Sequence, residues 1–237
     1  MPGMGTLINV AAIAAGGLIG LVLKNAFPQA MQETLIKAMG VCTLFIGIAG
    51  ALPGLVTLED GALASGSSMM LILSMALGAL TGSLLALEER LEAFGVWLRR
   101  KTGSEQDASF LNGFLTASLT VCIGAMAVVG SIQDGLMGDL SLLAAKSVLD
   151  FIIVMVLAAA LGKGCIFSAV PVGLLQGGIT LLARFLEPLM TPAAVANLST
   201  VGSVLIFCVG VNLVWGLGIK VANLLPALVA AVALALV

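Results

Sequence analysis

Long runs of apolar residues, separated by short polar segments, dominate this sequence. The runs cover about residues 5–23, 34–52, 67–87, 109–130, 140–161, 164–185, 198–217 and 220–237. Each is close to the roughly 20 residues that an α-helix needs to cross the hydrocarbon core of a bilayer. The pattern therefore predicts eight transmembrane helices. Because only Lys220 and Asn223 interrupt the last two runs, a seven-span count is the alternative.

The composition leads to the same fold class. Of the 237 residues, 60% are hydrophobic and 9% are charged, whereas a soluble domain carries roughly 25% charged residues. We therefore predict an all-α polytopic transmembrane bundle that forms a single domain over residues 1–237. The net charge of −2 argues against a basic surface for nucleic acid. Membrane lipids and a small solute or ion are the expected partners.

Lysine and arginine are concentrated in alternate connections between the apolar runs. Eight of the ten lie in or flank the first, third, fifth and seventh connections: Lys24, Lys37, Arg90, Arg99, Arg100, Lys101, Lys163 and Lys220. Connections rich in these residues stay in the cytoplasm. The pattern therefore predicts that both termini lie outside if there are eight spans, and that the C-terminus lies inside if there are seven.

The third connection is the longest and has an amphipathic pattern. Its apolar residues recur at helical spacing between Leu91 and Leu98, and the cationic run 99–101 follows. Such a helix lies in the headgroup layer, where its cationic end meets anionic lipid. We predict a cytoplasmic interfacial helix near residues 88–101. It serves as a membrane-surface anchor or, alternatively, as a gate or partner site.

A lysine and an aspartate interrupt the fifth apolar run. Lys146 and Asp150 are four residues apart, so on a helix they share one face. Each charge costs about 2.5–3.5 kcal/mol near the centre of a membrane, so this face should turn toward protein or water. Two interpretations follow. Asp150 binds and releases a proton or Na⁺ with Lys146 as its counter-charge, or the two residues form a structural clamp.

Four amide side chains also lie within apolar runs or at their start: Asn9, Asn112, Gln176 and Asn212. An amide can hold helices together by hydrogen bonds, or it can line a solute site because it donates and accepts at once. We predict a shared polar interior that contacts the solute, although sequence alone does not show that the four converge.

The first and second apolar runs resemble the sixth and seventh. Gly16-Gly17 in the first run corresponds to Gly177-Gly178 in the sixth, and residues 39–45 in the second match residues 201–207 in the seventh. The two pairs are five spans apart, which is an odd number of crossings. They would therefore face opposite ways across the membrane. Spans 1–2 and 6–7 would then form an inverted repeat, which is a recurrent plan among secondary transporters.

The sixth run carries residues that weaken a helix. Pro171 lies shortly before Gln176, Gly177 and Gly178, and proline and glycine both disfavour a helix interior. We therefore predict a broken or kinked helix near residues 171–178. Gly16 and Gly17 form either the matching discontinuity or a close-packing surface. Small-residue faces of this kind would also allow a homo-oligomer.

The residues for most catalytic chemistry are missing from the sequence. It contains no histidine, and its four cysteines lie singly within apolar runs. No glycine-rich phosphate loop ending in Lys-Ser or Lys-Thr is present. We therefore expect no enzyme, no cofactor and no metal site.

Three glycine-rich segments carry a resemblance to a known family. Gly5–Asn9 (GTLIN), Gly16–Gly20 (GGLIG) and Met39–Gly47 (MGVCTLFIG) resemble the first part of the bacterial YqgA/YdfK-like integral membrane family, domain of unknown function 554. The resemblance implies a polytopic protein of the bacterial inner membrane. It assigns no functional residues.

The leading functional hypothesis is ion- or proton-coupled secondary transport of a small solute, with Asp150 as the coupling carboxylate. Intramembrane carboxylates mark ion and proton pathways. The alternative is a non-transporting inner-membrane scaffold or lipid-associated protein in which Lys146 and Asp150 form a structural pair.

Overall fold

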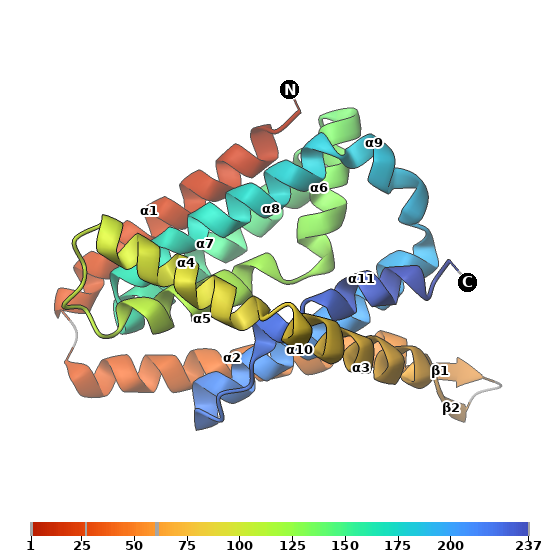
Figure 1. Cartoon of the computed structure of the whole chain (residues 1–237), viewed down its shortest axis with the longest axis horizontal. Helices are drawn as coiled ribbons and strands as arrows, with labels where there is room; N and C mark the ends of the chain where they lie inside the picture. The colour runs from red at the N-terminus through yellow and green to blue at the C-terminus, as the bar shows by residue number, and fades with distance from the viewer. Residues whose placement is uncertain (1, 27, 60–61, 237) are drawn as a thin grey trace. The chain divides into compact units, whose positions relative to one another are not determined.

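The secondary structure is almost entirely helical (Figure 1). The computed structural model describes residues 2–26, 28–59 and 62–236, so both ends of the expected domain, residues 1 and 237, lie outside the described part. The α-helices are α1 (Met4–Ala26), α2 (Gln29–Leu55), α3 (Ser68–Leu84), α4 (Leu87–Lys101), α5 (Phe110–Cys122), α6 (Ala125–Met137), α7 (Ser141–Leu161), α8 (Ala169–Leu181), α9 (Ala183–Leu186), α10 (Pro192–Trp215) and α11 (Pro226–Ala233). The predicted all-α class is confirmed.

Short elements join these helices. Between α2 and α3, strands β1 (Val56–Glu59) and β2 (Ala62–Ser65) form a two-stranded antiparallel hairpin in which Val56 pairs with Ser65. The 3-10 turns are η1 (Lys163–Ser168), η2 (Glu187–Leu189) and η3 (Val221–Leu224).

Five helical segments of the described chain are long and apolar enough to cross a membrane: α1, α2, α7, η1 with α8, and α10. Two bent pairs, α3 with α4 and α5 with α6, raise this number to seven if each pair is one broken span. The last apolar segment, Val221–Ala233, is shorter. At 1.5 Å per residue it is about 20 Å long, less than the roughly 30 Å of a hydrocarbon core. The described helices therefore give five spans, or up to seven if both bent pairs cross, which is fewer than the eight first expected.

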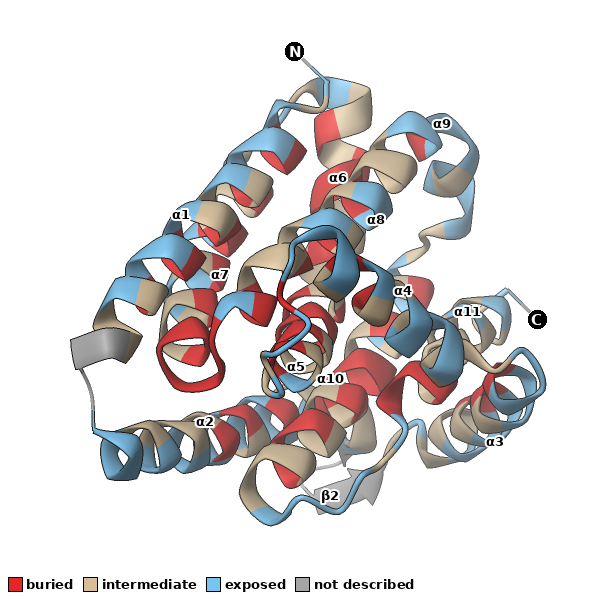
Figure 2. Cartoon of the chain, turned by 60° about the vertical axis from the view of Figure 1, so that its left-hand side comes forward, coloured by how far each residue is buried: buried red, intermediate tan, exposed pale blue. Residues whose placement is uncertain are grey.

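Many large apolar side chains on the long helices are exposed. Examples are Leu7, Leu18, Val22, Phe45, Leu80, Leu174 and Leu181. The pale blue along α1 in Figure 2 marks the exposed residues of that helix. Monomeric soluble proteins rarely expose contiguous apolar surface on this scale, whereas lipid accommodates it. The surface is that of a membrane protein.

The chain forms two compact units, each assembled from separate stretches of sequence. Unit 1 comprises Met1–Met39, Glu89–Cys122 and Met126–Leu186, and unit 2 comprises Gly40–Glu88, Ile123–Ala125 and Glu187–Val237. The core of unit 1 lies among α1, α5, α7 and α8, and includes Ile13, Val121, Val154, Leu157 and Val172.

Glycines bring α1 against α7 in unit 1. A Cβ atom at Gly16 would collide with the carbonyl oxygen of Phe151, and one at Gly20 would collide with that of Met155. Because the residue numbers rise together, the two helices run parallel. The Gly16–Gly20 face is therefore a close-packing surface within the chain, as one of the two interpretations predicted.

The helix α8 runs antiparallel to α1 in the same unit. Gly17 faces Ile166, just before α8, and Gly173 faces Val10. The residue numbers of the two elements therefore change in opposite directions. This arrangement places α8 beside the same stretch of α1 that meets α7.

Unit 2 is built in a similar way from α2, α3, α10 and α11. Gly47 packs against Phe207, and Gly40 packs against Val214, so α2 and α10 are antiparallel. Gly78 of α3 packs against Ala227 of α11. Close approach at glycine thus stabilises the helix packing inside each unit.

The predicted break in the sixth run is wrong. The helix α8 continues from Ala169 to Leu181, through Pro171, Gln176, Gly177 and Gly178. Proline is tolerated because Pro171 lies in the first turn, where the backbone N–H groups have no partner within the helix. A discontinuity at Gly16 and Gly17 is also wrong, because α1 is continuous there.

The fourth run, which was expected to be unbroken, contains the actual discontinuity. The helix α5 ends at Cys122, α6 begins at Ala125, and the pair is bent by more than 40°. Gly124 lies between them with φ at +142°, a backbone conformation that favours glycine. The run therefore forms two short helices.

The segment near residues 88–101 is helical, as α4, but its apolar face covers protein. Leu98, Leu91 and Phe94 pack against Phe110 and Phe114 of α5. On this face Trp97 is the residue left largely outside, with 53% of its surface exposed. Placement of α4 at the membrane surface stays a prediction.

Candidate functional site

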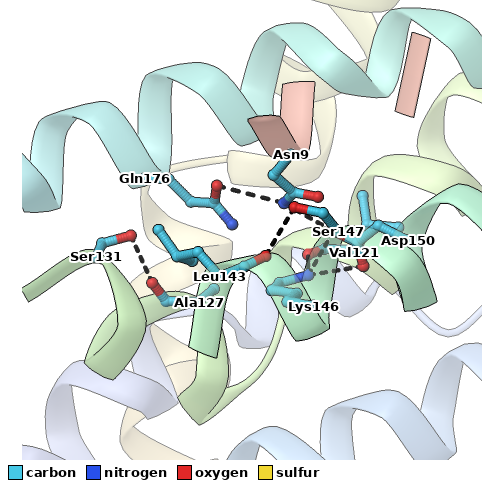
Figure 3. A network of polar contacts seen from close by, with 9 residues as sticks. All are labelled: Asn9, Val121, Ala127, Ser131, Leu143, Lys146, Ser147, Asp150 and Gln176. Carbon is cyan, nitrogen blue, oxygen red and sulfur yellow. Dashed lines mark hydrogen bonds and ion pairs between the residues drawn. The ribbon is translucent and has the colours of Figure 1, made fainter. Parts of the chain in front are cut away.

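The charged pair of the fifth run lies in the interior of unit 1. The helix α7 is continuous over Ser141–Leu161, so Lys146 and Asp150 lie one turn apart on the same face. Lys146 Nζ lies 2.7 Å from Asp150 Oδ1 and 2.6 Å from Oδ2 (Figure 3). The two residues are only 6% and 3% exposed. The pair faces protein and not lipid.

Two amide side chains from other helices join this pair, and Figure 3 shows those of Asn9 and Gln176 pointing toward one another. Asn9 of α1 donates through Nδ2 to Asp150 Oδ2 at 2.9 Å and to Gln176 Oε1 at 3.3 Å. Asn9 is fully buried and Gln176 is 1% exposed. The packing of α1 against both α7 and α8 sets Asn9 at the level of the ion pair. The structure thus brings four of the predicted site residues together.

A backbone group completes the contacts of the ammonium. Lys146 Nζ donates to the carbonyl oxygen of Val121 at 2.8 Å. Val121 lies in the last turn of α5, and the last four carbonyls of an α-helix have no partner within it. The break after Cys122 therefore creates the acceptor. The partial negative charge at a helix C-terminus also favours a cation there.

Sequence reasoning missed Val121, because a backbone acceptor has no side-chain signature. The only available signal was Gly124 in the fourth apolar run, and glycines occur in almost every run.

Two buried polar atoms of the cluster have no hydrogen-bond partner among the described residues. They are Asn9 Oδ1 and Gln176 Nε2. The amide of Asn9 cannot turn over without cost, because an ionised carboxylate only accepts and requires Nδ2 toward Asp150. A buried polar atom without a partner costs about 1–3 kcal/mol. Atoms of this kind call for an explanation, such as a role in binding.

The neighbouring hydroxyl groups in Figure 3 are occupied within their own helices. Ser147 Oγ donates to the Leu143 carbonyl at 2.7 Å, and Ser131 Oγ donates to the Ala127 carbonyl at 2.6 Å. They therefore add buried polarity without contributing to the Lys146 and Asp150 contacts.

The other two predicted amide residues lie elsewhere. Asn112 is exposed on α5 and accepts a hydrogen bond from Thr116 Oγ1. Asn212 is in unit 2, where its Nδ2 donates to the Ile219 carbonyl and its Oδ1 accepts from the Ile219 N–H, both at 2.8 Å. The prediction that all four amides share one polar interior is wrong for these two.

A second carboxylate is buried in unit 1. Asp134 of α6 is fully buried, and its Oδ2 accepts from the backbone N–H groups of Gly3 and Gly5, at 3.1 Å each. These groups belong to the start of α1, where a helix favours an anion. Asp134 thus caps α1 from another element, a role that sequence spacing does not reveal.

Comparison with known proteins identifies the family. A family model described as "Protein of unknown function (DUF554)" matches residues 4–236. The chain belongs to this family. The match runs through the sequence stretches of both units, and it confirms the resemblance found in the glycine-rich segments.

Two relatives of this DUF554 chain cover nearly its whole length. It is 29% identical over 238 residues to "Uncharacterized protein YqgA" of Escherichia coli (strain K12), covering 98% of this chain and 95% of the relative. It is 30% identical over 224 residues to "Uncharacterized membrane protein YdfK" of Bacillus subtilis (strain 168), covering 94% and 92%. No solved structure matches. The apolar helices and these relatives make this a membrane protein of the DUF554 family.

Proposed function

We propose that this protein is a secondary transporter of the bacterial inner membrane, and that it couples movement of a small solute to a proton or another cation. Asp150 is the coupling carboxylate and Lys146 is its counter-charge. The observation that carries the proposal is the triple contact of the Lys146 ammonium, which binds both Asp150 oxygens and the free Val121 carbonyl.

A charged pair inside a membrane protein is expensive to bury and most often serves a pathway. Here the pair lies on the continuous helix α7, and Lys146 contacts the Val121 carbonyl at the end of α5, where the fourth run is broken. In secondary transporters, the ends of such half-helices coordinate the coupling ion near the middle of the membrane. When a cation or proton binds Asp150, the ammonium loses its partner. The site therefore has two charge-balanced arrangements, one with Lys146 on the carboxylate and one with the coupling ion there.

The two amide atoms that lack partners among the described residues supply solute contacts. Asn9 Oδ1 is an acceptor and Gln176 Nε2 is a donor. A small solute with one donor and one acceptor would satisfy both and recover their desolvation cost. Both amides are linked to Asp150 through Asn9 Nδ2, so solute and coupling ion would affect each other's binding.

The predicted inverted repeat supports a carrier plan. Its first pair of equivalent spans is α1 and α8, and its second pair is α2 and α10. Each pair packs antiparallel within its own unit, α1 with α8 through Gly17 and Gly173 and α2 with α10 through Gly40 and Gly47. Equivalent helices of an inverted repeat cross the membrane in opposite directions.

The helix directions also support the proposed topology. The first and fifth spans, α1 and α7, run parallel, and the sixth, η1 with α8, is antiparallel to α1. In a multi-span protein, odd-numbered spans cross the membrane in one direction and even-numbered spans in the other, which agrees with these directions. With the lysine-rich and arginine-rich connections in the cytoplasm, seven spans place the N-terminus outside and the C-terminus inside. The cationic end of α4 would then meet anionic lipid.

Transport can be tested in proteoliposomes on a solid-supported membrane. Defined mixtures of amino acids, sugars and carboxylic acids are applied at several pH values, in sodium or choline buffer, and the current is recorded. We expect the wild type to give a solute-dependent current that changes with pH or sodium, and Asp150→Asn to give none. Asp139→Asn, which alters an exposed carboxylate, is the control. An unchanged current and pH dependence in Asp150→Asn would contradict the coupling role.

One observation favours the second candidate, a non-transporting scaffold. All three N–H donors of the Lys146 ammonium have acceptors, and α7 is continuous around the pair. A clamp between α7 and the end of α5 would use these contacts. In that case, replacing the pair with apolar residues in Lys146→Met/Asp150→Leu would leave function in the cell intact. A transporter would lose it.

A further inference from the structure

We infer that Asp150 and the Val121 carbonyl form a binding site for a monovalent metal cation of the Na⁺ class, and that the Lys146 ammonium is a tethered competitor for this site. The inference rests on the proposed function, because it names the ion that Asp150 couples to transport.

Three oxygen atoms surround the Lys146 ammonium. Lys146 Nζ lies 2.6 Å and 2.7 Å from the two carboxylate oxygens and 2.8 Å from the carbonyl oxygen. Carboxylate and carbonyl oxygens are the ligands that hard metal cations prefer. Rings of such oxygens replace the hydration shell of a monovalent ion in membrane proteins. The ammonium therefore occupies a point that suits a dehydrated monovalent cation.

The negative charge around the ammonium position suits a monovalent cation. The single negative charge of Asp150 balances one positive charge, and the C-terminus of α5 adds a partial negative charge. A monovalent cation satisfies the site without an excess of positive charge. A divalent cation would leave one uncompensated charge among buried side chains, which is costly.

The Lys146 ammonium and a metal cation cannot occupy the site at the same time. Asp150 and Val121 O both contact Lys146 Nζ, so a metal ion cannot occupy that point until the ammonium leaves. The lysine stem is long and flexible enough for such a movement. Asn9 acts as a positioning residue, because its Nδ2 donates to Asp150 Oδ2 at 2.9 Å. Because one cation replaces the other, the Asp150 carboxylate always has a cation beside it in the buried interior.

The test removes the competitor and measures cation binding directly. Lys146→Met is purified in detergent, and its midpoint of thermal unfolding is followed by tryptophan fluorescence in LiCl, NaCl, KCl or choline chloride at equal ionic strength. We expect a saturable rise of the midpoint with at least one metal cation and none with choline, because a ligand that binds only the folded state stabilises it. Lys163→Met, which removes a lysine outside the site, is the matched control and should behave like the wild type.

Two further measurements keep the inference falsifiable. Lys146→Met/Asp150→Asn should lose the cation-specific rise. If the variants do not fold, the wild type decides. It should retain ²²Na⁺ at one ion per chain, displaced by excess unlabelled NaCl and not by choline chloride. Absence of both the midpoint shift and retained ²²Na⁺ overturns the inference.

These outcomes separate the inference from the proposed function. Binding of Na⁺ in detergent without any solute current in proteoliposomes would support the cation site and contradict the transporter. A solute current that depends on pH and persists in sodium-free buffer, with no bound metal cation, would keep the transporter and overturn this inference. The coupling ion would then be the proton.

Discussion

The ammonium nitrogen of Lys146 lies 2.8 Å from the carbonyl oxygen of Val121, at the last turn of α5. The contact joins the second turn of the continuous helix α7 to the end of α5, where the fourth apolar run is broken. It also links the ion pair to the helix break, because the break leaves the Val121 carbonyl oxygen available as one of the three oxygens that bind the ammonium. Hydrogen bonds to charged groups contribute about 1.5–3 kcal/mol each.

The first prediction concerns removal of one member of the pair. Asp150→Asn should lower the free energy of unfolding in detergent by about 3–5 kcal/mol, because it leaves the buried ammonium without its counter-charge. Lys146→Met/Asp150→Leu should restore most of this loss, because it removes both charges. Thermal unfolding of the purified variants gives the measurement.

Lys101→Met serves as the control for the first prediction, because Lys101 is exposed at the end of α4. It should change stability by less than about 0.5 kcal/mol. A double variant that is less stable than Asp150→Asn would show that the pair does not act as one unit. Solute current in the restored double variant would in addition argue against the coupling role of Asp150.

The second prediction compares two glycine positions that look alike in the sequence. Gly16→Ala should destabilise the protein by about 1–3 kcal/mol, because its Cβ collides with the Phe151 carbonyl and α1 must move away from α7. Gly178→Ala should be neutral or stabilising by up to about 1 kcal/mol, because alanine is the better helix former. Within the described chain, no atom lies within 4 Å of a Cβ built at Gly178.

Thermal unfolding of the two single variants checks this difference. Gly177→Ala is the second neutral control, since a Cβ there also has no neighbour within 4 Å in the described part of the chain. Equal destabilisation at Gly16 and Gly178 would mean that α1 and α7 do not pack as closely as their glycines indicate.

Sequence patterns predicted the helical class and the apolar runs, because a membrane span needs a long apolar segment that local composition displays. The boundaries of α1, α2 and α7 agree with the expected runs within a few residues. The Lys146–Asp150 pair was also predictable, because a spacing of four residues fixes a shared helix face. Its burial followed from the cost of exposing two charges to lipid.

The predictions that failed depend on tertiary contacts. A proline weakens a helix where its missing N–H would have donated to a carbonyl of the preceding turn. Pro171 lies in the first turn of α8, which begins at Ala169, so no such hydrogen bond is lost. Asn9 and Asn212 have the same side chain in similar apolar surroundings. Asn9 meets Asp150, whereas Asn212 binds a backbone segment seven residues later. Only packing of α1 against α7 distinguishes these two asparagines.

The third prediction tests this distinction. Asn212→Leu should remove both hydrogen bonds to Ile219 and destabilise the segment after α10 by about 0.5–1.5 kcal/mol for each lost bond, because the two bonds are only partly buried. Hydrogen–deuterium exchange should therefore rise in residues 216–220. Asn112→Leu, on an exposed position, should leave the exchange unchanged.

Asn212→Leu should also leave solute current and cation binding unaltered, whereas Asn9→Leu should weaken both, because only Asn9 contacts Asp150. Loss of current in Asn212→Leu, with unchanged exchange after α10, would return Asn212 to the set of solute contacts.

The fourth prediction concerns pH, at the connection before α7. Asp139 Oδ1 accepts from Ser141 Oγ at 2.5 Å and from the Ser141 N–H at 2.9 Å. These bonds favour the carboxylate and lower the pKa of Asp139 below its ordinary 3.8. Their stabilising effect is therefore complete above about pH 4 and is lost as the pH falls through the lowered pKa. Ser141→Ala should raise this pKa toward 3.8, as measured by NMR with labelled aspartate. Ser147→Ala, whose hydroxyl binds the Leu143 carbonyl, should not. An unchanged Asp139 titration in Ser141→Ala would rule out the hydroxyl as the cause.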